Sequence, residues 1–351
     1  MIPDASIVVV NHRSAEHALR CVESLRSCLA GEGIAGEILV VDCGSGEEEA
    51  HRLEAAGADL LLPLAENRGY SGGVNAGLAR ARAEKLVLSN ADVLYLPGSL
   101  GPLLEALDDP SVGAAAPLTF WDAGGALRLP PGYAPGFWRD LAQVAGGRLR
   151  GLDERRFAAF ARETLGLWER GGKTRHLSGA VLAARRTVFD RVGRFDERFP
   201  FEYEESEWED RVRKKGLDLV FVPRSRVRHL WARSAADGAE TARRRAVSRQ
   251  TYRQRRYGGL GRVLLEAVER ARPSAPRLRR LEEPSFAPQA GETLALSPNP
   301  SFLPFAGASL AEGFRLPEEI RSALPPTPLY FRTFRDFDGR PLESWVWEGR
   351  R

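Results

Sequence analysis

The sequence has few cysteines, a single methionine and no long apolar run. Cys21, Cys28 and Cys43 lack the spacing of a metal site or a disulfide framework, so we expect reduced, buried thiols in a cytosolic protein. No apolar run approaches the roughly 18–20 residues that a membrane span needs. The first residues also lack the basic segment of a signal peptide. We therefore expect a cytoplasmic protein without a transmembrane helix.

Charge is nearly balanced overall but unevenly placed. The formal net charge is +4, whereas residues 243–280 hold 13 arginines against two glutamates, a local net charge of +11. This segment favours contact with an anionic membrane or a polyprenyl-phosphate-linked glycan, or else a solvated helix face packed on the protein. In a nucleic-acid-binding protein, aromatic residues would be expected between the arginines of such a segment. Only Tyr252 and Tyr257 occur there, so we expect no nucleic acid partner.

Apolar runs alternate with segments of helical period over the first 120 residues. Residues 6–11, 37–42, 60–64 and 85–89 have the pattern of buried strands, and a segment with a period near 3.6 residues follows each of them. This alternation is typical of an α/β protein with a parallel sheet.

The last third of the chain has a different pattern. The arginine-rich region is helical in pattern but broken at Gly258-Gly259, and a proline-rich linker follows it. Two aromatic, alternating runs within residues 327–349 flank Asp338-Gly339 and predict a β-hairpin. We expect a main α/β domain at 1–240, an arginine-rich helical segment and linker at 241–285, and an extension at 286–351.

Polar side chains follow four of the predicted strands. Ligands of open parallel sheets bind at the carboxyl ends of strands. We therefore expect four polar groups to share one rim: Asn11, Asp42, Asn67-Arg68 and Asn90/Asp92. Asp42 could accept from a base N–H or a ribose hydroxyl, or merely cap the next helix. Asn90 and Asp92 offer hard oxygen ligands for Mg²⁺ or Mn²⁺ held jointly with substrate phosphates. The alternative is an Asx-turn that only ends the strand.

A glycine-rich turn leads from the third strand into a helix. Its residues are Asn67, Arg68 and Gly69, followed by Gly72, Gly73 and Gly77. Backbone N–H groups of such a turn can approach phosphate oxygens, and Arg68 offers a fork for a pyrophosphate or a base edge. A plain flexible loop is the alternative. The spacing fits neither G-x-G-x-x-G nor the Walker pattern, which argues against a dinucleotide-dependent oxidoreductase.

Acidic residues gather at a predicted helix start within residues 199–216. Like charges beside aromatic rings raise a carboxylate's pKa and make a general base plausible. Glu205 and Glu209 share a helix face, although a solvated acidic helix start would explain the cluster equally well. His229 follows an apolar β run, with Ser234 five residues on, and a lone histidine is more often structural.

Taken together, these stretches resemble glycosyltransferase family 2, especially its bacterial rhamnosyltransferase-like members. The resemblance runs from about Ser6 to Ser234 and weakens across 120–174. It is carried by the order and spacing of SIVVVNHRSAEHALRCVESL, EILVVDCGSG, ENRGYSGGVNAGLARA, LVLSNADVLYLPGSL and the stretch from HLSGAVLAARR to RHLWARS. It implies the GT-A fold, a Rossmann-like mixed and mostly parallel sheet flanked by helices, here with a C-terminal helical and β-hairpin extension.

The resemblance also implies roles for the matching positions. Asp92, in the place of the family's D-x-D or N-P-D motif, and His229, in its H-x-x-x-x-S segment, are the implied ligands of Mg²⁺ or Mn²⁺. Glu204-Glu205 stands where the family usually has Glu-Asp, which makes Glu205 the implied general base. The implied nucleotide-sugar-binding residues are Asn11, Arg13, Asp42, Asn67, Arg68, Gly69, Asn90, Ala91 and Asp92, and the acceptor-side residues are Gly179, Ala180 and Trp208.

On this resemblance we expect an inverting glycosyltransferase of cell-surface polysaccharide synthesis. It would move a sugar, with rhamnose one candidate, from a nucleotide-diphosphate sugar to a hydroxyl of a glycan or lipid-linked glycan. Two positions depart from the family: Asn90 replaces an acid, and Glu205 replaces an aspartate, which moves the carboxylate by about 1.5 Å. A non-catalytic nucleotide-sugar-binding protein is therefore the alternative. The base, the sugar, the acceptor and the oligomeric state do not follow from the sequence.

Overall fold

In the computed structural model the chain forms two compact units. Unit 1 comprises Met1–Thr119 and Gly171–Arg255, and unit 2 comprises Phe120–Arg170 and Arg256–Arg351. The described residues are 2–132, 135–138, 140–141, 150–230, 238–270, 278–324 and 327–349. Ser234 and residues 271–277 of the expected linker therefore lie outside them. Within the described ranges, no helix combines the length and apolarity needed to cross a bilayer.

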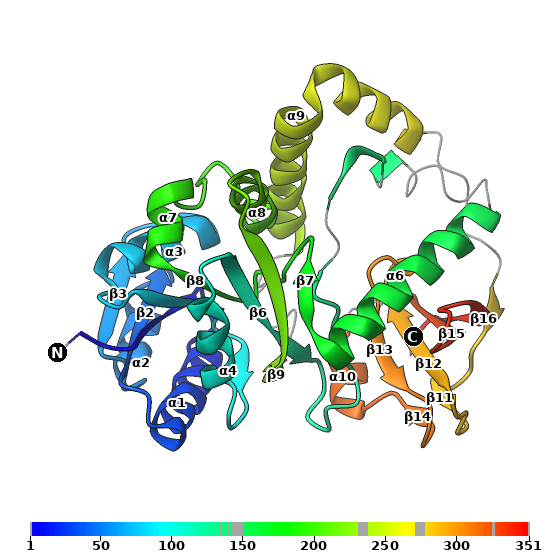
Figure 1. The fold of residues 1–351 in the computed structure, drawn as a ribbon, viewed down its shortest axis with the longest axis horizontal. Coiled ribbons are helices and arrows are strands. Elements are labelled where there is room, and N and C mark those ends of the chain that lie inside the picture. The colour runs from blue at the N-terminus through cyan, green and yellow to red at the C-terminus, as the bar shows by residue number, and fades with distance from the viewer. Residues whose placement is uncertain are drawn as a thin grey trace. The chain divides into compact units, whose positions relative to one another are not determined.

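Unit 1 is built on a nine-stranded sheet with the order β3-β2-β1-β4-β8-β6-β9-β5, and β7 pairs with β9 (Figure 1). The first four strands in this order are parallel, and β8, β5 and β7 pair antiparallel with their neighbours. This arrangement confirms the predicted α/β class. The strands are β1 (Ala5–Asn11), β2 (Gly36–Cys43), β3 (Leu60–Leu64), β4 (Lys85–Asn90), β5 (Val93–Tyr95), β6 (Val112–Phe120), β7 (Gly172–Thr174), β8 (Val181–Arg185) and β9 (Asp218–His229).

Helices cover both faces of this sheet because successive side chains of a strand point to opposite sides. Ile7 and Val9 of β1 join the apolar cluster that includes α1, whereas Val8 and Val10 face α3. Figure 1 shows α1 and α3 on opposite sides of the sheet. The helices of unit 1 are α1 (Ala15–Glu32), α2 (Glu47–Glu54), α3 (Gly69–Arg80), α4 (Leu100–Glu105), α7 (Arg186–Val192) and α8 (Glu204–Lys214), with a 3-10 turn, η1, at Ala106–Asp108.

The glycines after Arg68 have two different roles. Gly69 begins α3 with φ +70, and a Cβ there would lie 2.8 Å from Pro200 O. Gly73 and Gly77 lie inside α3, where a Cβ would approach Val10 Cγ1 at 2.6 Å and Val8 Cγ1 at 2.3 Å. These two glycines let α3 pack closely on the sheet, so of these three only Gly69 belongs to the turn that the sequence suggested for phosphate contact.

Unit 2 contains a five-stranded sheet with the order β10-β16-β15-β12-β13. Strands β15 and β16 are antiparallel neighbours joined through Asp338-Gly339, which confirms the predicted hairpin. The elements of unit 2 are α6 (Arg150–Arg170), β10 (Arg279–Arg280), β11 (Ser285–Phe286), β12 (Glu292–Ser297), β13 (Ala306–Ser309), β14 (Phe314–Arg315), α10 (Glu318–Ala323), β15 (Leu329–Arg335) and β16 (Pro341–Trp347). Helix α9 (Gly238–Arg270) runs from one unit into the other and is non-helical at Gly258, φ 70, as its sequence indicated.

Residues 120–170 join the C-terminal part of the chain in unit 2, whereas the sequence pattern predicts one domain over 1–240. Phe157 of α6 packs against Phe305 and Phe334, with ring centroids 5.5 and 5.3 Å apart. Arg128 exchanges two backbone hydrogen bonds of 2.8 Å with Gly307 of β13. Contacts between residues so distant in the chain leave no periodic signal in the sequence, so local patterns do not predict this division.

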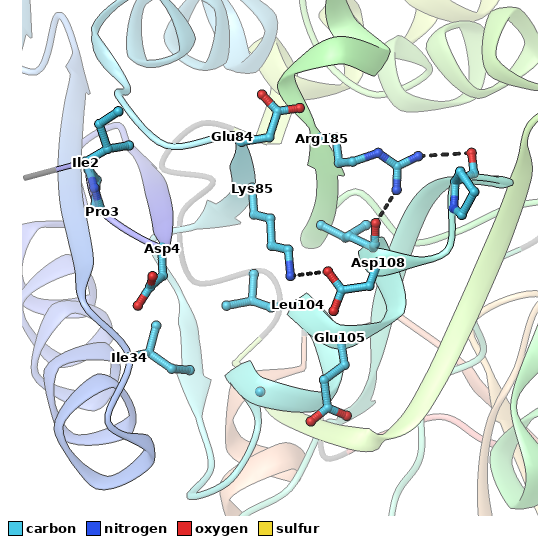
Figure 2. A pocket seen from close by; sticks show the side chains of 13 residues that line it. Ile2, Pro3, Asp4, Ile34, Glu84, Lys85, Leu104, Glu105, Asp108 and Arg185 are labelled. Atoms are coloured by element: carbon cyan, nitrogen blue, oxygen red, sulfur yellow. Dashed lines mark hydrogen bonds and ion pairs between the residues drawn. The ribbon is translucent and has the colours of Figure 1, made fainter.

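A cavity of about 690 Å³ opens at the edge of the unit 1 sheet where β1 and β4 begin (Figure 2). Its lining includes Pro3, Lys85 and Arg185. Lys85 Nζ is paired with Asp108 at 2.6 Å, and Arg185 donates to backbone carbonyls at the end of η1. The cavity lies at the edge opposite the polar strand ends, and its two cations already have protein partners.

Candidate active site

The carboxyl ends of β1 and β2 are joined by their side chains. The strands are parallel with Asn11 beside Asp42, and Asn11 Nδ2 donates to Asp42 Oδ1 at 2.8 Å. Asn11 Oδ1 accepts from Ser14 Oγ at 2.8 Å, and Asp42 Oδ2 accepts from the backbone N–H of Ser45 at 3.1 Å. Asn11 and Asp42 are almost fully buried. Here they hold the two loops that leave the strands, and Arg13, with its N–H on Ser45 Oγ, lies in one of these loops.

His12 and Asn67 link this rim to the start of α3. His12 Nδ1 lies 2.8 Å from Cys43 O and must donate to it, since a carbonyl only accepts. Burial lowers the pKa of His12, so Nε2 is free of a proton and can accept from Asn67 Nδ2 at 3.1 Å. Asn67 Oδ1 in turn accepts from the Gly69 N–H at 2.9 Å. The loop around Arg68 is thereby tied to the ends of β1 and β2.

Arg68 is engaged by a carboxylate that the sequence did not single out. Its Nη2 donates to Glu197 Oε2 at 2.7 Å, and Asn75 Nδ2 donates to Glu197 Oε1 at 3.0 Å. Burial opposes the charge of Glu197, but the hydrogen bonds from Asn75 and Arg68 outweigh it and lower its pKa. A diphosphate that binds Arg68 must therefore share its guanidinium with Glu197 or displace it.

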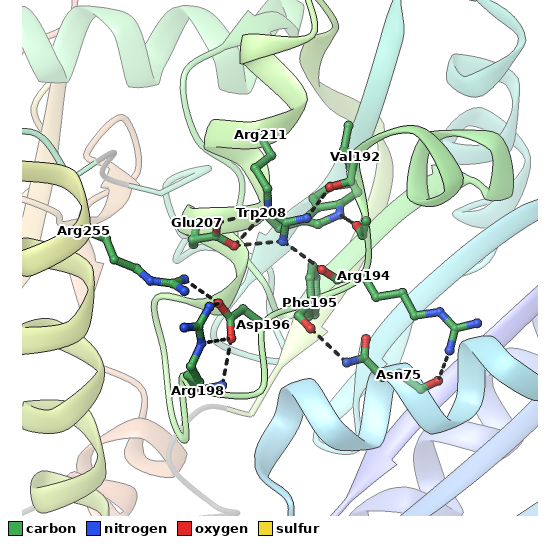
Figure 3. A network of polar contacts seen from close by, with 11 residues as sticks. Asn75, Val192, Arg194, Phe195, Asp196, Arg198, Glu207, Trp208, Arg211 and Arg255 are labelled. Atoms are coloured by element: carbon green, nitrogen blue, oxygen red, sulfur yellow. Dashed lines mark hydrogen bonds and ion pairs between the residues drawn. The ribbon is translucent and has the colours of Figure 1, made fainter.

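Residues 192–200, which carry Glu197, are fixed from several sides (Figure 3). Arg211 of α8 donates to Arg194 O at 2.8 Å, and Asn75 of α3 donates to Phe195 O at 2.9 Å. Asp196 accepts from Arg198 and from Arg255 of α9. The segment that leads into α8 thus has its position set by three helices.

Trp208 belongs to this framework and not to an acceptor surface. Its indole Nε1 donates to Gly193 O at 2.9 Å, and its ring stacks on Phe189 with centroids 4.8 Å apart. The residue is 0% exposed. The prediction that Trp208 lies on the acceptor side is therefore corrected: a fully buried indole has no face for a bound glycan.

Asp92 and His229, 137 positions apart, meet at the rim. Strand β5 follows Asp92 directly and pairs with β9, so that Val93 lies opposite His229, and Leu230 N donates to Asp92 O at 2.9 Å. His229 Nε2 lies 3.1 Å from Asp92 Oδ1, and both residues are buried. Burial opposes the charge of Asp92, but His229 outweighs it and lowers the pKa of the carboxyl.

The donor set of this pair fits a divalent cation. A carboxylate oxygen and an imidazole nitrogen are ligands that such cations accept, and Mg²⁺ commonly takes its remaining ligands from substrate phosphates and water. Within the part of the chain that the structure describes, no third acidic, histidine or cysteine side chain joins them to form a closed site. Asn90 precedes Asp92 in the same turn, and Ser234, the other expected member of this segment, lies outside the described residues.

The two glutamates at the start of α8 differ in their surroundings. Glu204 is buried, its Oε2 has no hydrogen-bond partner among the described residues, and burial together with Glu205 raises its pKa well above the ordinary value. Glu205 is half-buried. Burial raises its pKa to about 7, with His176 opposing the rise and Glu209 adding to it. A carboxyl with a pKa near 7 suits a general base at neutral pH.

Residues 176–180 connect Glu205 to the Asp92 turn. A Cβ added at Gly179 would lie 3.3 Å from Glu205 Cγ, so this backbone runs along the glutamate side chain. Ala180 O accepts from the Asn90 N–H at 2.9 Å. Gly179 O accepts from the Tyr70 hydroxyl of α3 at 3.0 Å. The predicted base, the predicted acceptor-side backbone and the predicted metal turn therefore form one continuous set of contacts.

Several residues of this site were missed in the sequence. Ser45 and His12 follow predicted strand ends closely and could have been found by that signal. Glu197, Tyr70 and His176 have no such signal, because each acts on a group distant in the chain.

Comparisons with known sequences cover most of the stretches that carry the family resemblance. Residues 6–193 match the family model described as Glycosyl transferase family 2. The chain is 29% identical over 247 residues to an N-acetylglucosaminyl-diphospho-decaprenol L-rhamnosyltransferase of Mycobacterium tuberculosis, which covers 65% of this chain and 76% of the relative. It is 35% identical over 111 residues to the succinoglycan biosynthesis protein ExoO of Rhizobium meliloti, which covers 30% of each chain.

Similar solved structures include GalNAc-T7 with UDP, GalNAc and Mn²⁺, at 18% identity and a TM-score of 0.48, covering 74% of this chain. This chain spans 51% of that protein, about half of its length. Another is the mannosyltransferase PcManGT of Pyrobaculum calidifontis in complex with GDP-Man and Mn²⁺, at 16% identity and a TM-score of 0.46, covering 78% of this chain and 77% of that one.

Proposed function

The chain belongs to glycosyltransferase family 2, and on that premise we propose an inverting transfer of a sugar from a nucleotide-diphosphate donor to a hydroxyl of a lipid-linked glycan. The mycobacterial relative, named for L-rhamnose and a decaprenol-linked acceptor, supports rhamnose as the sugar and a polyprenyl-linked acceptor. ExoO supports a place in cell-surface polysaccharide synthesis.

The observation that carries this proposal is the contact path from Glu205 to Asp92. Gly179 lies against Glu205, the next residue bonds to Asn90, and Asp92 follows two residues later beside His229. A base and a cation-binding pair on one rim are the two parts that a single displacement at an anomeric carbon needs. The base must reach the acceptor hydroxyl, and the cation pair must reach the leaving diphosphate.

The proposed reaction is one displacement. The Glu205 carboxylate takes the proton of the acceptor hydroxyl while that oxygen forms a bond to the anomeric carbon. The bond between this carbon and the diphosphate oxygen breaks, so the configuration inverts and the nucleoside diphosphate leaves with the electron pair. Asp92 and His229 would hold Mg²⁺ or Mn²⁺, which when bound stabilises the charge that develops on the diphosphate.

The nucleotide would lie over the ends of β1 and β2. Asn11 and Asp42 hold the loops there in place. Asp42 Oδ1 accepts from both Asn11 and the Ser45 hydroxyl, so only Oδ2, which accepts one N–H, retains a lone pair for a base or ribose donor. We assign the phosphates to the Asn67, Arg68 and Gly69 turn at the start of α3, where the helix dipole favours negative charge.

A thermal-shift screen should identify the donor. dTDP-, UDP- and GDP-sugars are tested with and without Mn²⁺, and one base should raise Tm by several degrees, more with Mn²⁺ than without. A ligand present at about 100 times its Kd adds about 2.7 kcal/mol of stability. No shift with any of the three nucleotide classes would contradict donor binding.

A lipid-linked acceptor also gives a role to α9. Leu260, Val263 and Leu264 lie on one helix face at i, i+3 and i+4 and are 87%, 54% and 45% exposed. Some of the arginines of α9 are already paired within the protein, such as Arg245 with Glu202 and Arg262 with Glu266. We assign the apolar face, together with the surrounding positive charge, to peripheral contact with an anionic membrane surface.

Vesicle flotation tests this contact. The protein should float with anionic vesicles and much less with neutral ones, and high salt should weaken the association. The double variant Leu260→Ser, Leu264→Ser should lose flotation, whereas Leu342→Ser, at a leucine of β16 that is 40% exposed, should keep it. Absence from anionic vesicles at low salt would rule the membrane contact out.

A further inference from the structure

A histidine and a glutamate that nothing in the sequence connects form a buried pair behind Glu205. His176 lies between β7 and β8, Glu209 lies one turn after Glu205 in α8, and their side chains are 10% and 0% exposed. His176 Nδ1 contacts Glu209 Oε2, and Glu209 Oε1 accepts from the Leu177 N–H at 2.9 Å. Both carboxylate oxygens are therefore occupied by one short segment of the chain.

This pairing sets how residues 176–180 lie along α8. Gly179 lies three residues after His176. A Cβ added there would lie 3.3 Å from Glu205 Cγ and 3.5 Å from Glu205 Cδ. The segment is also held from its other side, because Gly179 O accepts from Tyr70 and Ala180 O accepts from Asn90. The Glu205 side chain thus packs against a backbone that is fixed at both ends.

The pair also determines the charge that Glu205 experiences. Two glutamates at i,i+4 repel each other, and burial strengthens the repulsion. Burial opposes protonation of His176, but Glu209 outweighs it and raises the pKa of the imidazole. With His176 protonated, the pair has no net charge. The positive imidazole then offsets the Glu209 carboxylate, so Glu209 repels the ionised form of Glu205 less.

We infer that His176 and Glu209 are a positioning pair, which holds the Glu205 carboxylate in place and keeps it able to accept a proton. This inference rests on the proposed role of Glu205 as the base. Neither residue is assigned contact with the reacting atoms, and both act through Glu205. Other titratable or charged groups that act on these side chains, among the residues that the structure describes, include Glu204 and Arg213 of α8, Glu202 before it, and Tyr70 of α3.

The His176→Gln variant tests the pair without any substrate. Glutamine can still donate to Glu209 but has no positive charge. The carboxyl ¹³C signal of Glu205, identified as the one lost in Glu205→Gln, should titrate in the parent protein at about 7 because its pKa is raised to about 7. Ordinary glutamates titrate near about 4.3. In His176→Gln the midpoint should rise by about 1 pH unit or more, the size that loss of a neighbouring opposite charge produces.

Activity should report the same change once the donor is known. The acidic limb of the kcat/KM profile should move to higher pH in His176→Gln by the amount that the NMR midpoint moves. A purely structural role would lower Tm and leave both midpoints where they are. Lys173→Gln is the matched control: it removes one positive charge from the same segment, but its side chain is 74% exposed, so neither midpoint should move.

Two further variants separate the outcomes. The double variant His176→Gln, Glu209→Gln removes both charges and should return the midpoint toward the parent value. Glu209→Gln alone removes the repelling carboxylate, so the titration midpoint of Glu205 must not rise. This variant tests the pair even if His176→Gln does not fold, because a higher midpoint would contradict it. An unmoved midpoint in folded His176→Gln overturns the positioning pair, whereas full activity of Glu205→Gln overturns the proposed base instead.

Discussion

The Glu205→Gln variant should lose about 10²–10⁴-fold in kcat while it binds the donor as tightly as the parent protein. Glutamine keeps the shape of the side chain and one accepting oxygen, but its amide cannot take the proton of the acceptor hydroxyl. Because the pKa of Glu205 is raised to about 7, the parent rate should rise with pH as the carboxylate ionises through that value. The variant should lose this rise.

The measurement is release of nucleoside diphosphate under saturating donor, with donor affinity determined separately by calorimetry. A fall in kcat with unchanged donor affinity assigns the loss to the chemical step. Glu23→Gln, on the exposed face of α1, is the control and should be fully active. A Glu205→Gln protein with parental kcat would remove this residue from the role of base, and a protein that binds donor but never transfers sugar would favour the non-catalytic alternative.

The structure gives a reason why glutamate can act where the family usually has aspartate. The segment facing Glu205 carries a glycine, and a Cβ at Gly179 would press on Glu205 Cγ at 3.3 Å. The longer side chain therefore uses space that Gly179 leaves open. Glu205→Asp should retain a base that is withdrawn by about 1.5 Å, so its kcat should fall below that of the parent but stay above that of Glu205→Gln.

The Asp92→Ala variant should lose the part of donor affinity that depends on Mn²⁺ and should lower kcat by about 10²–10³-fold, as removal of one group that stabilises developing charge typically does. The carboxylate is held ionised by His229 at 3.1 Å. Without the Asp92 carboxylate only the His229 imidazole is left, and one nitrogen ligand is too little to hold a hard cation against water.

Donor titrations with and without Mn²⁺ measure this effect. The parent protein should bind the donor more tightly with Mn²⁺, and Asp92→Ala should bind it equally in both conditions. Asp92→Asn keeps the volume of the buried side chain and guards against loss of fold. Asp108→Ala is the control, since Asp108 is an exposed aspartate at the opposite edge of the sheet. Identical titration curves for Asp92→Ala and the parent would refute the assignment of Asp92 to the metal.

Much of the fold of unit 1 could be predicted from local patterns. Strands that are buried on both faces read as continuous apolar runs, as residues 6–11 and 37–42 do. The hairpin at Asp338-Gly339 was predictable because its turn chemistry is local. The continuous strand β9 (Asp218–His229) is harder to predict, since Pro223 and Arg224 interrupt its apolar pattern. The place of residues 120–170 was not predictable, because it depends on aromatic packing against strands more than 100 residues away.

The sequence alone determined which functional groups are available and on which elements they lie. These are an amide and a carboxylate at the end of a buried strand, an arginine before a helix, and two glutamates at the start of another helix. Only the tertiary structure decided which of these groups meet. Pairing of β5 with β9 brings His229 to Asp92, and residues 176–180 carry contacts from Glu205 to Asn90. The acidic cluster suggested a raised carboxyl pKa, but its size at Glu205 depends on desolvation and on the charges of His176 and Glu209, which only the fold packs around this carboxyl.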